Sequence, residues 1–134
     1  MKNYSKNVLL DMSCSLIHHG HVRIIKKASK YGKLIISLTT DSDLKKYKKI
    51  IPELNFSQRK EILNALKYVD KVIPGPFVLS QKFLDKNKID ILIQGSDYKK
   101  RFFKNKTITL PRTINISSTK VRELAAKNIL NITK

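Results

Sequence analysis

Short apolar runs alternate with segments of helical spacing along the chain, and this alternation constrains the fold more than any other feature. The runs that suit buried strands are 8–12, 34–39, 71–74, 90–94 and 107–110. The segments with helical spacing are 20–31, 56–69, 80–87 and 118–127. Strands that alternate with helices favour a parallel sheet with helices on both faces. We therefore predict an α/β fold, a Rossmann-like doubly wound parallel five-stranded sheet, in one domain over 1–134.

Capping and turn residues predict where several of these elements begin and end. Gly32 suits the C-terminus of the first helix, and Asn55 suits the N-cap of the second. Asp41 can cap a short helical turn through Leu44. The basic stretch 45–52 ends at a proline, so we expect it to form a loop.

The chain carries a formal net charge of +18, which by itself suggests a polyanionic partner. The excess comes mainly from lysine, with 23 lysines against 5 arginines, and the chain is also rich in isoleucine and asparagine. Lysine, isoleucine and asparagine have A/T-rich codons, so genome composition explains much of the charge. We therefore do not expect a nucleic-acid partner, although a positive field would attract a nucleotide triphosphate.

Three features bear on the cellular compartment. No apolar run reaches the roughly 18 residues of a membrane span, and the polar segment 1–6 lacks the apolar stretch of a secretory signal. The single cysteine, Cys14, cannot form an intrachain disulfide and fits a reducing environment. We expect a cytoplasmic protein that does not bind a membrane.

The first strand leads through a polar turn into His18-His19-Gly20-His21, where a helix begins. In a parallel α/β sheet, ligands bind beyond the carboxyl ends of the strands. A helix N-terminus at that edge binds anions, because its free N–H groups and the helix dipole point outward. His18 and His21 are three residues apart, so we expect both imidazoles to face this mouth.

A second polar cluster lies near the C-terminus, where Ser117, Ser118 and Thr119 precede a helix. Hydroxyl side chains at this place cap helices. Arg112 lies just upstream and Lys120 just inside the helix, which makes the cluster suitable for phosphate binding. Taken alone, the cluster is equally well explained by capping beside a solvated basic face.

Together the two clusters resemble the cytidylyltransferase-like branch of the nucleotidyltransferase superfamily. That family has an HxGH motif after its first strand and an RTxGISTTK-like or GISSTK-like motif near its C-terminus, which match 18–21 and 112–120. Segments that resemble further family landmarks, in the family's order, are 38–41, 58–60, 68–74 and 95–98. The resemblance runs from Val8 to Glu123.

Two branches of the family compete. Segments 12–21 and 116–120 look most like the cytidylyltransferase domains of phosphonate pathways, whereas 110–113 looks more like glycerol-3-phosphate cytidylyltransferases. The adenylyltransferases of the same fold are a more distant match and remain an alternative. A non-catalytic basic protein that binds nucleotide or nucleic acid is a second alternative.

The resemblance implies an enzyme that transfers CMP from CTP to a small alcohol phosphate or phosphonate. An acceptor oxygen would attack the α-phosphorus of CTP, and pyrophosphate would leave without a covalent enzyme intermediate. Catalysis would then rest on placement and electrostatic stabilisation. Mg²⁺ would neutralise the triphosphate and the leaving pyrophosphate, with no protein metal ligand assigned. The resemblance also implies a homodimer.

The resemblance assigns roles to individual residues. The catalytic residues would be His18, His21, Lys48 and Arg112, with His21 at the α-phosphate; Lys48 lies 11 residues before Arg59, as the family's catalytic lysine does. The nucleotide-binding residues would be Met12, Ser13, Gly20, Gly95, Asp97, Tyr98, Ser117, Ser118 and Thr119. Arg59 would bind substrate or pyrophosphate-side oxygens. Asp70 is either a substrate contact or a helix-end residue.

The sequence departs from the family pattern at two places. Ser15 stands where the family usually has an aspartate, and Asn115 stands where it usually has a glycine. Asparagine tolerates a left-handed backbone, so we expect the turn at 115 to be kept. We expect Cys14 to be a small loop residue, because no mechanism of this fold needs a thiol.

Overall fold

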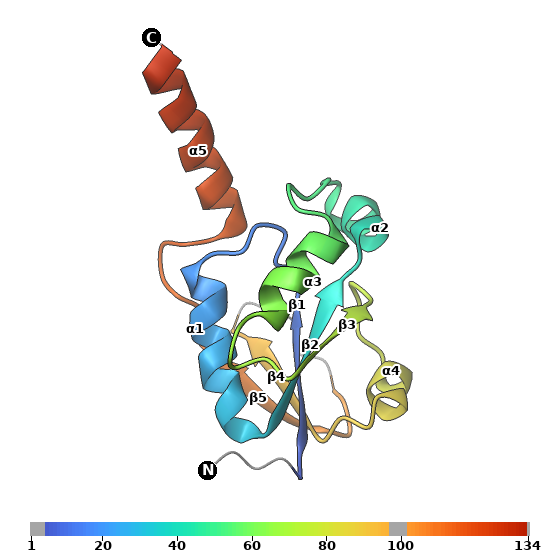
Figure 1. Cartoon of the computed structure of the whole chain (residues 1–134). Coiled ribbons are helices and arrows are strands. Elements are labelled where there is room, and N and C mark those ends of the chain that lie inside the picture. Colours follow the sequence, from blue (N-terminus) through green and yellow to red (C-terminus); the bar gives the residue numbers. More distant parts are fainter. Residues whose placement is uncertain (1–4, 97–101, 134) are drawn as a thin grey trace.

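The computed structural model describes residues 5–96 and 102–133 and contains one parallel sheet (Figure 1). Its strands are β1 (Asn7–Met12), β2 (Lys33–Thr39), β3 (Lys71–Gly75), β4 (Ile91–Gly95) and β5 (Lys106–Leu110). Their order is β3-β2-β1-β4-β5, and every neighbouring pair is parallel. The chain reverses its direction of winding between β1 and β4, which leaves a crevice at the carboxyl ends of these strands. The predicted α/β, Rossmann-like five-stranded sheet is confirmed.

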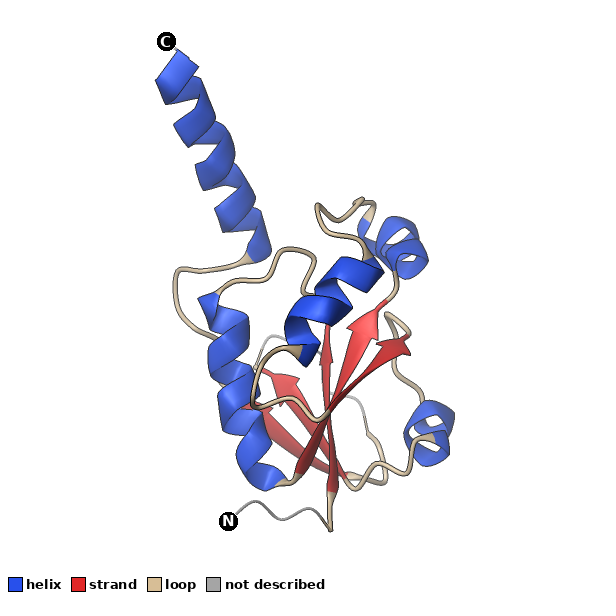
Figure 2. Ribbon diagram, in the orientation of Figure 1, coloured by secondary structure: helices blue, strands red, loops and turns tan. Residues whose placement is uncertain are grey.

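Helices cover both faces of this sheet, as predicted (Figure 2). The helical elements of the described residues are α1 (His19–Ala28), the 3₁₀ turn η1 (Ser29–Tyr31), α2 (Asp41–Asp43), the π-helical turn η2 (Leu44–Lys48), α3 (Phe56–Asn64), α4 (Gln81–Lys86) and α5 (Ser118–Thr133). In the described ranges, no helix combines the length and hydropathy that a membrane span requires.

The side chains of each strand point alternately to the two faces of the sheet, so the core has two parts. Leu10 packs with Ile25 of α1 and Leu63 of α3 on one face. Leu9 packs with Leu84 of α4 on the opposite face. Because successive strand residues point to opposite faces and both faces are covered, the strands read as nearly continuous apolar runs in the sequence.

The predicted capping of α3 is confirmed, but its predicted end is wrong. The Asn55 side chain accepts from the Gln58 N–H at 2.9 Å, and the Gln58 side chain accepts from the Asn55 N–H at 2.9 Å. The helix ends at Asn64 instead of continuing to 69. The following residues turn back toward the sheet, and the Asp70 N–H donates to the Leu34 carbonyl at 3.0 Å to start β3 beside β2.

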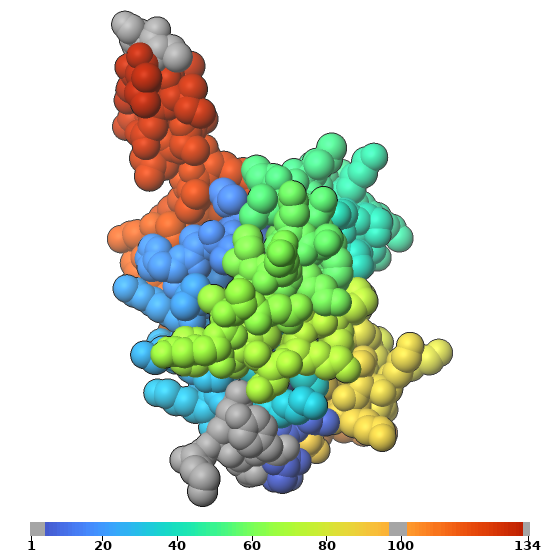
Figure 3. Space-filling view, viewed as in Figure 1, coloured from blue at the N-terminus to red at the C-terminus, as the bar shows by residue number. Residues whose placement is uncertain are grey.

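Two further boundaries differ from the prediction. The segment 44–48 forms a π-helical turn instead of the start of a loop, closed by Lys49, whose φ of 57° is left-handed and whose N–H donates to the Leu44 carbonyl. The last helix runs to Thr133 instead of 127, since no glycine or proline interrupts it. Its outer part stands away from the rest of the molecule (Figures 1 and 3), and Leu130 and Ile132 are exposed there.

Candidate active site

A cavity of about 460 Å³ lies at the carboxyl ends of β1 and β4, between the start of α1, η2 and the start of α5. This is the edge at which a doubly wound sheet binds ligands. The residues predicted for the site that line this cavity are Met12, Ser13, His18, Gly20, His21, Lys48, Gly95, Arg112, Ser117, Ser118 and Thr119. Two segments more than 90 residues apart in the sequence therefore meet at one cavity, as the sequence predicted.

The two histidines form the N-terminal cap of α1. His18 is the N-cap residue, and its Nδ1 accepts from the Gly20 N–H at 3.1 Å. The His18 N–H in turn donates to Nδ1 of His21 at 3.1 Å. The rings stack with centroids 3.8 Å apart and an interplanar angle of 28°. The HxGH spacing thus builds a reciprocal capping box from two imidazoles, in the way that Ser and Glu do elsewhere.

These hydrogen bonds determine which ring nitrogen of each histidine carries the proton. A ring nitrogen that accepts a hydrogen bond carries no proton, so each neutral ring has its proton on Nε2. Nε2 of His18 is buried and has no hydrogen-bond partner among the described residues. A buried donor without a partner needs a ligand or water to satisfy it. Both rings line the cavity, so the pair can supply N–H donors to an anion bound there.

The electrostatics of the site keep both rings neutral. Burial, reinforced by His18, Arg112 and Lys48, lowers the pKa of His21 to about 3. Burial, reinforced by His19 and Arg112, also lowers the pKa of His18. Both positive side chains that act on the rings belong to the predicted catalytic set. A negative ligand would neutralise this concentration of positive charge.

Gly20 makes the close packing of this corner possible. A Cβ atom at position 20 would come within 2.9 Å of Cε1 and Nδ1 of His18 and within 3.0 Å of Cγ2 of Ile116. All three contacts are tighter than ordinary van der Waals distances. Glycine therefore lets the α1 cap and the segment that leads into α5 approach each other.

The start of α5 forms the second wall of the cavity. The Ser117 Oγ accepts from the Lys120 N–H at 3.1 Å, and the Ser117 carbonyl accepts from the Val121 N–H at 3.0 Å, so Ser117 caps the helix. The Ser118 Oγ donates to the Leu16 carbonyl at 3.0 Å, which ties α5 to the loop after β1. Asn115 has a φ of 64°, and the predicted left-handed turn is confirmed.

The structure places Arg59 outside the cavity, which does not support the predicted contact with substrate. Its side chain is fully buried and does not line the cavity. Its Nη1 donates to the Ser13 carbonyl at 2.7 Å and to the Thr39 carbonyl at 3.0 Å. Its Nε donates to the Leu54 carbonyl at 3.1 Å, and its Nη2 pairs with Asp41 at 2.6 Å. Arg59 therefore holds together the backbone segments that surround the site.

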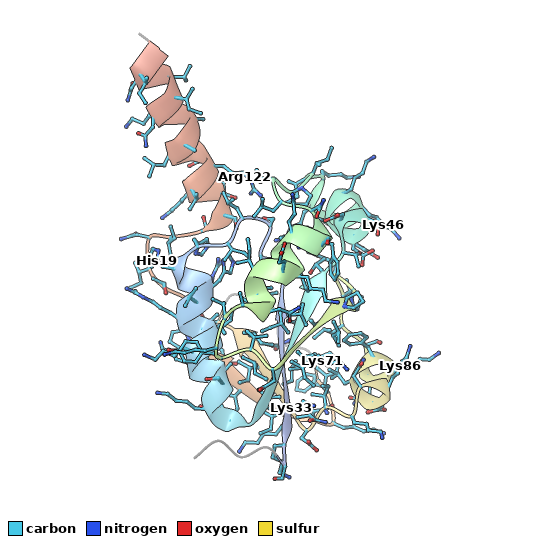
Figure 4. The ribbon with its side chains drawn as sticks, viewed as in Figure 1. His19, Lys33, Lys46, Lys71, Lys86 and Arg122 are labelled. Atoms are coloured by element: carbon cyan, nitrogen blue, oxygen red, sulfur yellow. The ribbon has the colours of Figure 1, made fainter. Side chains whose placement is uncertain are left out.

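The structure also places Asp70 away from the cavity, which does not support the substrate contact considered for it. Asp70 immediately precedes β3, and its Oδ2 accepts from the Leu34 N–H at 2.8 Å. The amino ends of parallel strands lie at the edge opposite the cavity. Figure 4 labels the neighbouring Lys71 at that edge, away from Arg122 at the base of α5. Asp70 directly precedes β3, six residues past the end of α3, and its hydrogen bond to Leu34 aligns β2 with β3.

Some predicted site residues are not among the described residues, and some residues of the site were not predicted. Asp97 and Tyr98 lie outside the described residues. Arg122 lines the cavity without having been predicted. The signal was available, because Arg122 follows Ser118 by four residues and so shares its helix face. Burial raises the pKa of the Cys14 thiol to about 12, which agrees with the expectation that Cys14 is a small loop residue.

The described residues contain no group of three His, Cys, Asp or Glu side chains that could hold a metal ion. Asp11 is the one carboxylate among the described residues that line the cavity. This donor set does not make a protein-held metal centre. It is compatible with a hard cation that arrives on a phosphate-containing ligand, because Mg²⁺ keeps several waters and needs few protein oxygens.

Comparison with known proteins identifies the family of the chain. Residues 14–124 match the cytidylyltransferase-like family. The chain belongs to this family and is a nucleotidyltransferase.

Individual relatives cover most of the chain. The glycerol-3-phosphate cytidylyltransferase of Bacillus subtilis (strain 168) is 34% identical over 88% of this chain and 95% of its own length. The glycerol-3-phosphate cytidylyltransferase of Staphylococcus aureus (strain NCTC 8325 / PS 47) is 33% identical over 88% of this chain and 93% of its own. The crystal structure of a lipopolysaccharide core biosynthesis protein from Thermoplasma volcanium GSS1 superposes with a TM-score of 0.71 at 22% identity, covering 81% of this chain and 98% of that one. That likeness supports the fold alone.

Proposed function

We propose that the protein transfers CMP from CTP to the phosphate of a small alcohol phosphate and releases pyrophosphate. The observation that carries the proposal is the meeting of the His18–His21 cap with the start of α5 across one cavity that also contains Lys48 and Arg112. The two glycerol-3-phosphate cytidylyltransferases that match most of the chain support glycerol-3-phosphate as the acceptor. An ethanolamine-phosphate-type acceptor and a phosphonate acceptor are the alternatives.

In the proposed reaction, an oxygen of the acceptor phosphate forms a bond to the α-phosphorus of CTP. The bond from that phosphorus to the bridging oxygen of the β-phosphate breaks, and its electron pair leaves with pyrophosphate. Negative charge increases on the α-phosphoryl oxygens and on the leaving group. The protein's task is to place the reactants and to stabilise that charge.

The residues that line the cavity suit this task. The Nε2–H groups of His18 and His21 would donate to α-phosphate oxygens. Lys48 and Arg112 would neutralise the charge that develops on the triphosphate. The N-terminus of α5, capped by Ser117, would hold the β- and γ-phosphates with its backbone N–H groups. Mg²⁺ would enter with CTP and be held mainly by phosphate oxygens and water.

Pyrophosphate release tests both the nucleotide and the acceptor. The purified protein is incubated with Mg²⁺ and CTP or ATP, each with glycerol-3-phosphate, ethanolamine phosphate or 2-aminoethylphosphonate. We expect release with CTP and glycerol-3-phosphate to exceed the other combinations at least tenfold. Release with ATP but not CTP would identify an adenylyltransferase, and release with the phosphonate alone would replace the proposed acceptor.

We also propose a homodimer. Four exposed apolar side chains on α5 offer an apolar surface for association: Leu124, Ile129, Leu130 and Ile132. Sedimentation velocity across a concentration series distinguishes a 15.5 kDa monomer from a dimer of twice that mass. A purely monomeric protein at high concentration would overturn this proposal.

A further inference from the structure

Arg122 connects three segments that surround the cavity. It lies in the first part of α5, and its Nε donates to both carboxylate oxygens of Glu53, at 2.6 and 2.5 Å. Its Nη2 donates to the Ser15 Oγ at 2.9 Å. We call this arrangement of Glu53, Arg122 and Ser15 the Arg122 bridge. Figure 4 labels Arg122 at the base of α5, on the side that faces the body of the molecule.

Glu53 belongs to residues 48–54, which lead from the end of η2 to the N-cap of α3 and which we call the Lys48 segment. Lys48 and Ile50 of this segment line the cavity. Beyond Glu53, the Leu54 carbonyl is bound by Arg59 and Asn55 caps α3, so the far end of the segment is fixed to the body. Between η2 and that fixed end, Glu53 provides a bond to the opposite wall of the cavity.

Ser15 belongs to the loop after β1 and is buried. It follows Cys14, whose φ of 44° gives the loop its turn. The neighbouring Leu16 carbonyl accepts from Ser118, so two hydrogen bonds join this loop to the first turn of α5. A serine at position 15 accepts from Arg122 as a neutral group. The full charge of Arg122 is therefore left to Glu53.

We propose that Arg122 is a positioning residue: by binding Glu53 and Ser15 together, it holds the Lys48 segment and the start of α5 at the separation that a bound triphosphate requires. This inference rests on the proposed function of the cavity. The hydrogen bond from Arg122 lowers the pKa of Glu53, so the pair stays ionised at neutral pH. The side chains of Arg122 and Glu53 are 28% and 42% exposed, so either residue can be substituted without unfolding the protein.

A competing arrangement would have Arg122 leave Glu53 and bind the phosphates directly. The two arrangements predict opposite effects of Glu53→Gln. If Arg122 acts through Glu53, removing the carboxylate charge releases the Lys48 segment and weakens CTP binding. If Arg122 binds phosphate itself, the same variant frees the guanidinium and strengthens CTP binding or leaves it unchanged.

The first experiment compares CTP binding and turnover for Glu53→Gln, Arg122→Gln and the double variant. We expect each single variant to raise the KM for CTP about tenfold with a smaller change in kcat, and the double variant to be no worse than the worse single variant, because both remove the same bond. The exchanged pair Glu53→Arg with Arg122→Glu should recover part of the loss. The exposed Glu61 provides the control, and Glu61→Gln should match the wild type. A KM that is unchanged or lower in Glu53→Gln would overturn the proposal.

The second experiment does not depend on the reaction. Hydrogen exchange is measured without nucleotide for peptides that cover 44–54. We expect faster exchange in Glu53→Gln and in Arg122→Gln, but not in Glu61→Gln. Unchanged exchange would contradict the bridge even if the enzyme is active, whereas faster exchange in a protein that releases no pyrophosphate would contradict only the proposed function.

Discussion

Replacing the buried Arg59 should destabilise the whole protein instead of weakening one substrate contact. The substitution Arg59→Met keeps much of the side-chain volume but removes every donor. It leaves the Ser13, Thr39 and Leu54 carbonyls without the guanidinium and Asp41 without its ion-pair partner. These four acceptors belong to three segments, at 13, 39–41 and 54, so the loss affects the site and the core together.

The size of the effect follows from the environment of each acceptor. Breaking a buried ion pair by removing one partner typically costs about 3–5 kcal/mol. The Asp41 side chain is 44% exposed and can regain water, so its own share is small. The bond to the Thr39 carbonyl is buried, and that acceptor loses its partner without compensation. We therefore expect a loss of about 3 kcal/mol, in the lower part of that range.

Thermal unfolding measures this loss. For 134 residues the unfolding entropy is about 0.28 kcal/mol/K, so a loss of 3 kcal/mol lowers Tm by roughly 10 °C. Arg59→Lys should lose nearly as much, because one ammonium group cannot reach all four acceptors. Arg23 is exposed on α1 and provides the control, so Arg23→Gln should change Tm by less than about 2 °C.

The result that would refute this reasoning is specific. If Arg59 acts on substrate, Arg59→Met would keep the wild-type Tm while its KM for CTP or for the acceptor rises. A variant with an unchanged Tm would show that the buried network contributes little to stability. It would also return Arg59 to the role that the sequence suggested.

Three further predictions follow from the site. The pKa of His21 lies near 3 in the folded chain and near 6.5 in the unfolded chain, so the folded state binds fewer protons between these values. The free energy of unfolding should therefore fall as the pH drops from about 6.5 toward 3. An NMR titration in which the His21 ring protonates near pH 6.5 would contradict this. Gly20→Ala should reduce kcat/KM at least tenfold, since the added Cβ displaces the His18 ring, and unchanged kinetics would show that the cap tolerates this shift. Cys14 should resist iodoacetamide at pH 8 in the folded protein and react once urea unfolds it; rapid labelling of the folded protein would contradict its burial.

The sheet and much of the site could be predicted because their signals are local. A strand that is covered on both faces must be apolar along its length, and a helix that starts at a ligand site needs capping groups. The HxGH spacing follows from the reciprocal cap, in which His18 and His21 must be three residues apart. These constraints act over a few residues, so the sequence alone displays them.

The roles of Arg59, Asp70 and Arg122 depend on contacts between distant segments. A charged residue near the start of a helix is normally exposed, and nothing near Arg59 in the sequence shows that acceptors from three segments converge on it. Arg122 and Glu53 are 69 residues apart in the chain. The place of Asp70 could have been inferred, because a residue that precedes a parallel strand lies at the edge opposite the carboxyl ends.

The central claim is that the His18–His21 cap acts on the α-phosphate of CTP. The most direct measurement follows CTP, glycerol-3-phosphate and Mg²⁺ by ³¹P NMR with wild-type protein, His21→Ala and the exposed control His19→Ala. We predict that pyrophosphate and a new diphosphate diester appear together in equal amounts, at similar rates for wild type and His19→Ala. The rate for His21→Ala should be about 10² to 10³-fold lower. No diester with wild-type protein, or an undiminished rate with His21→Ala, would contradict the account.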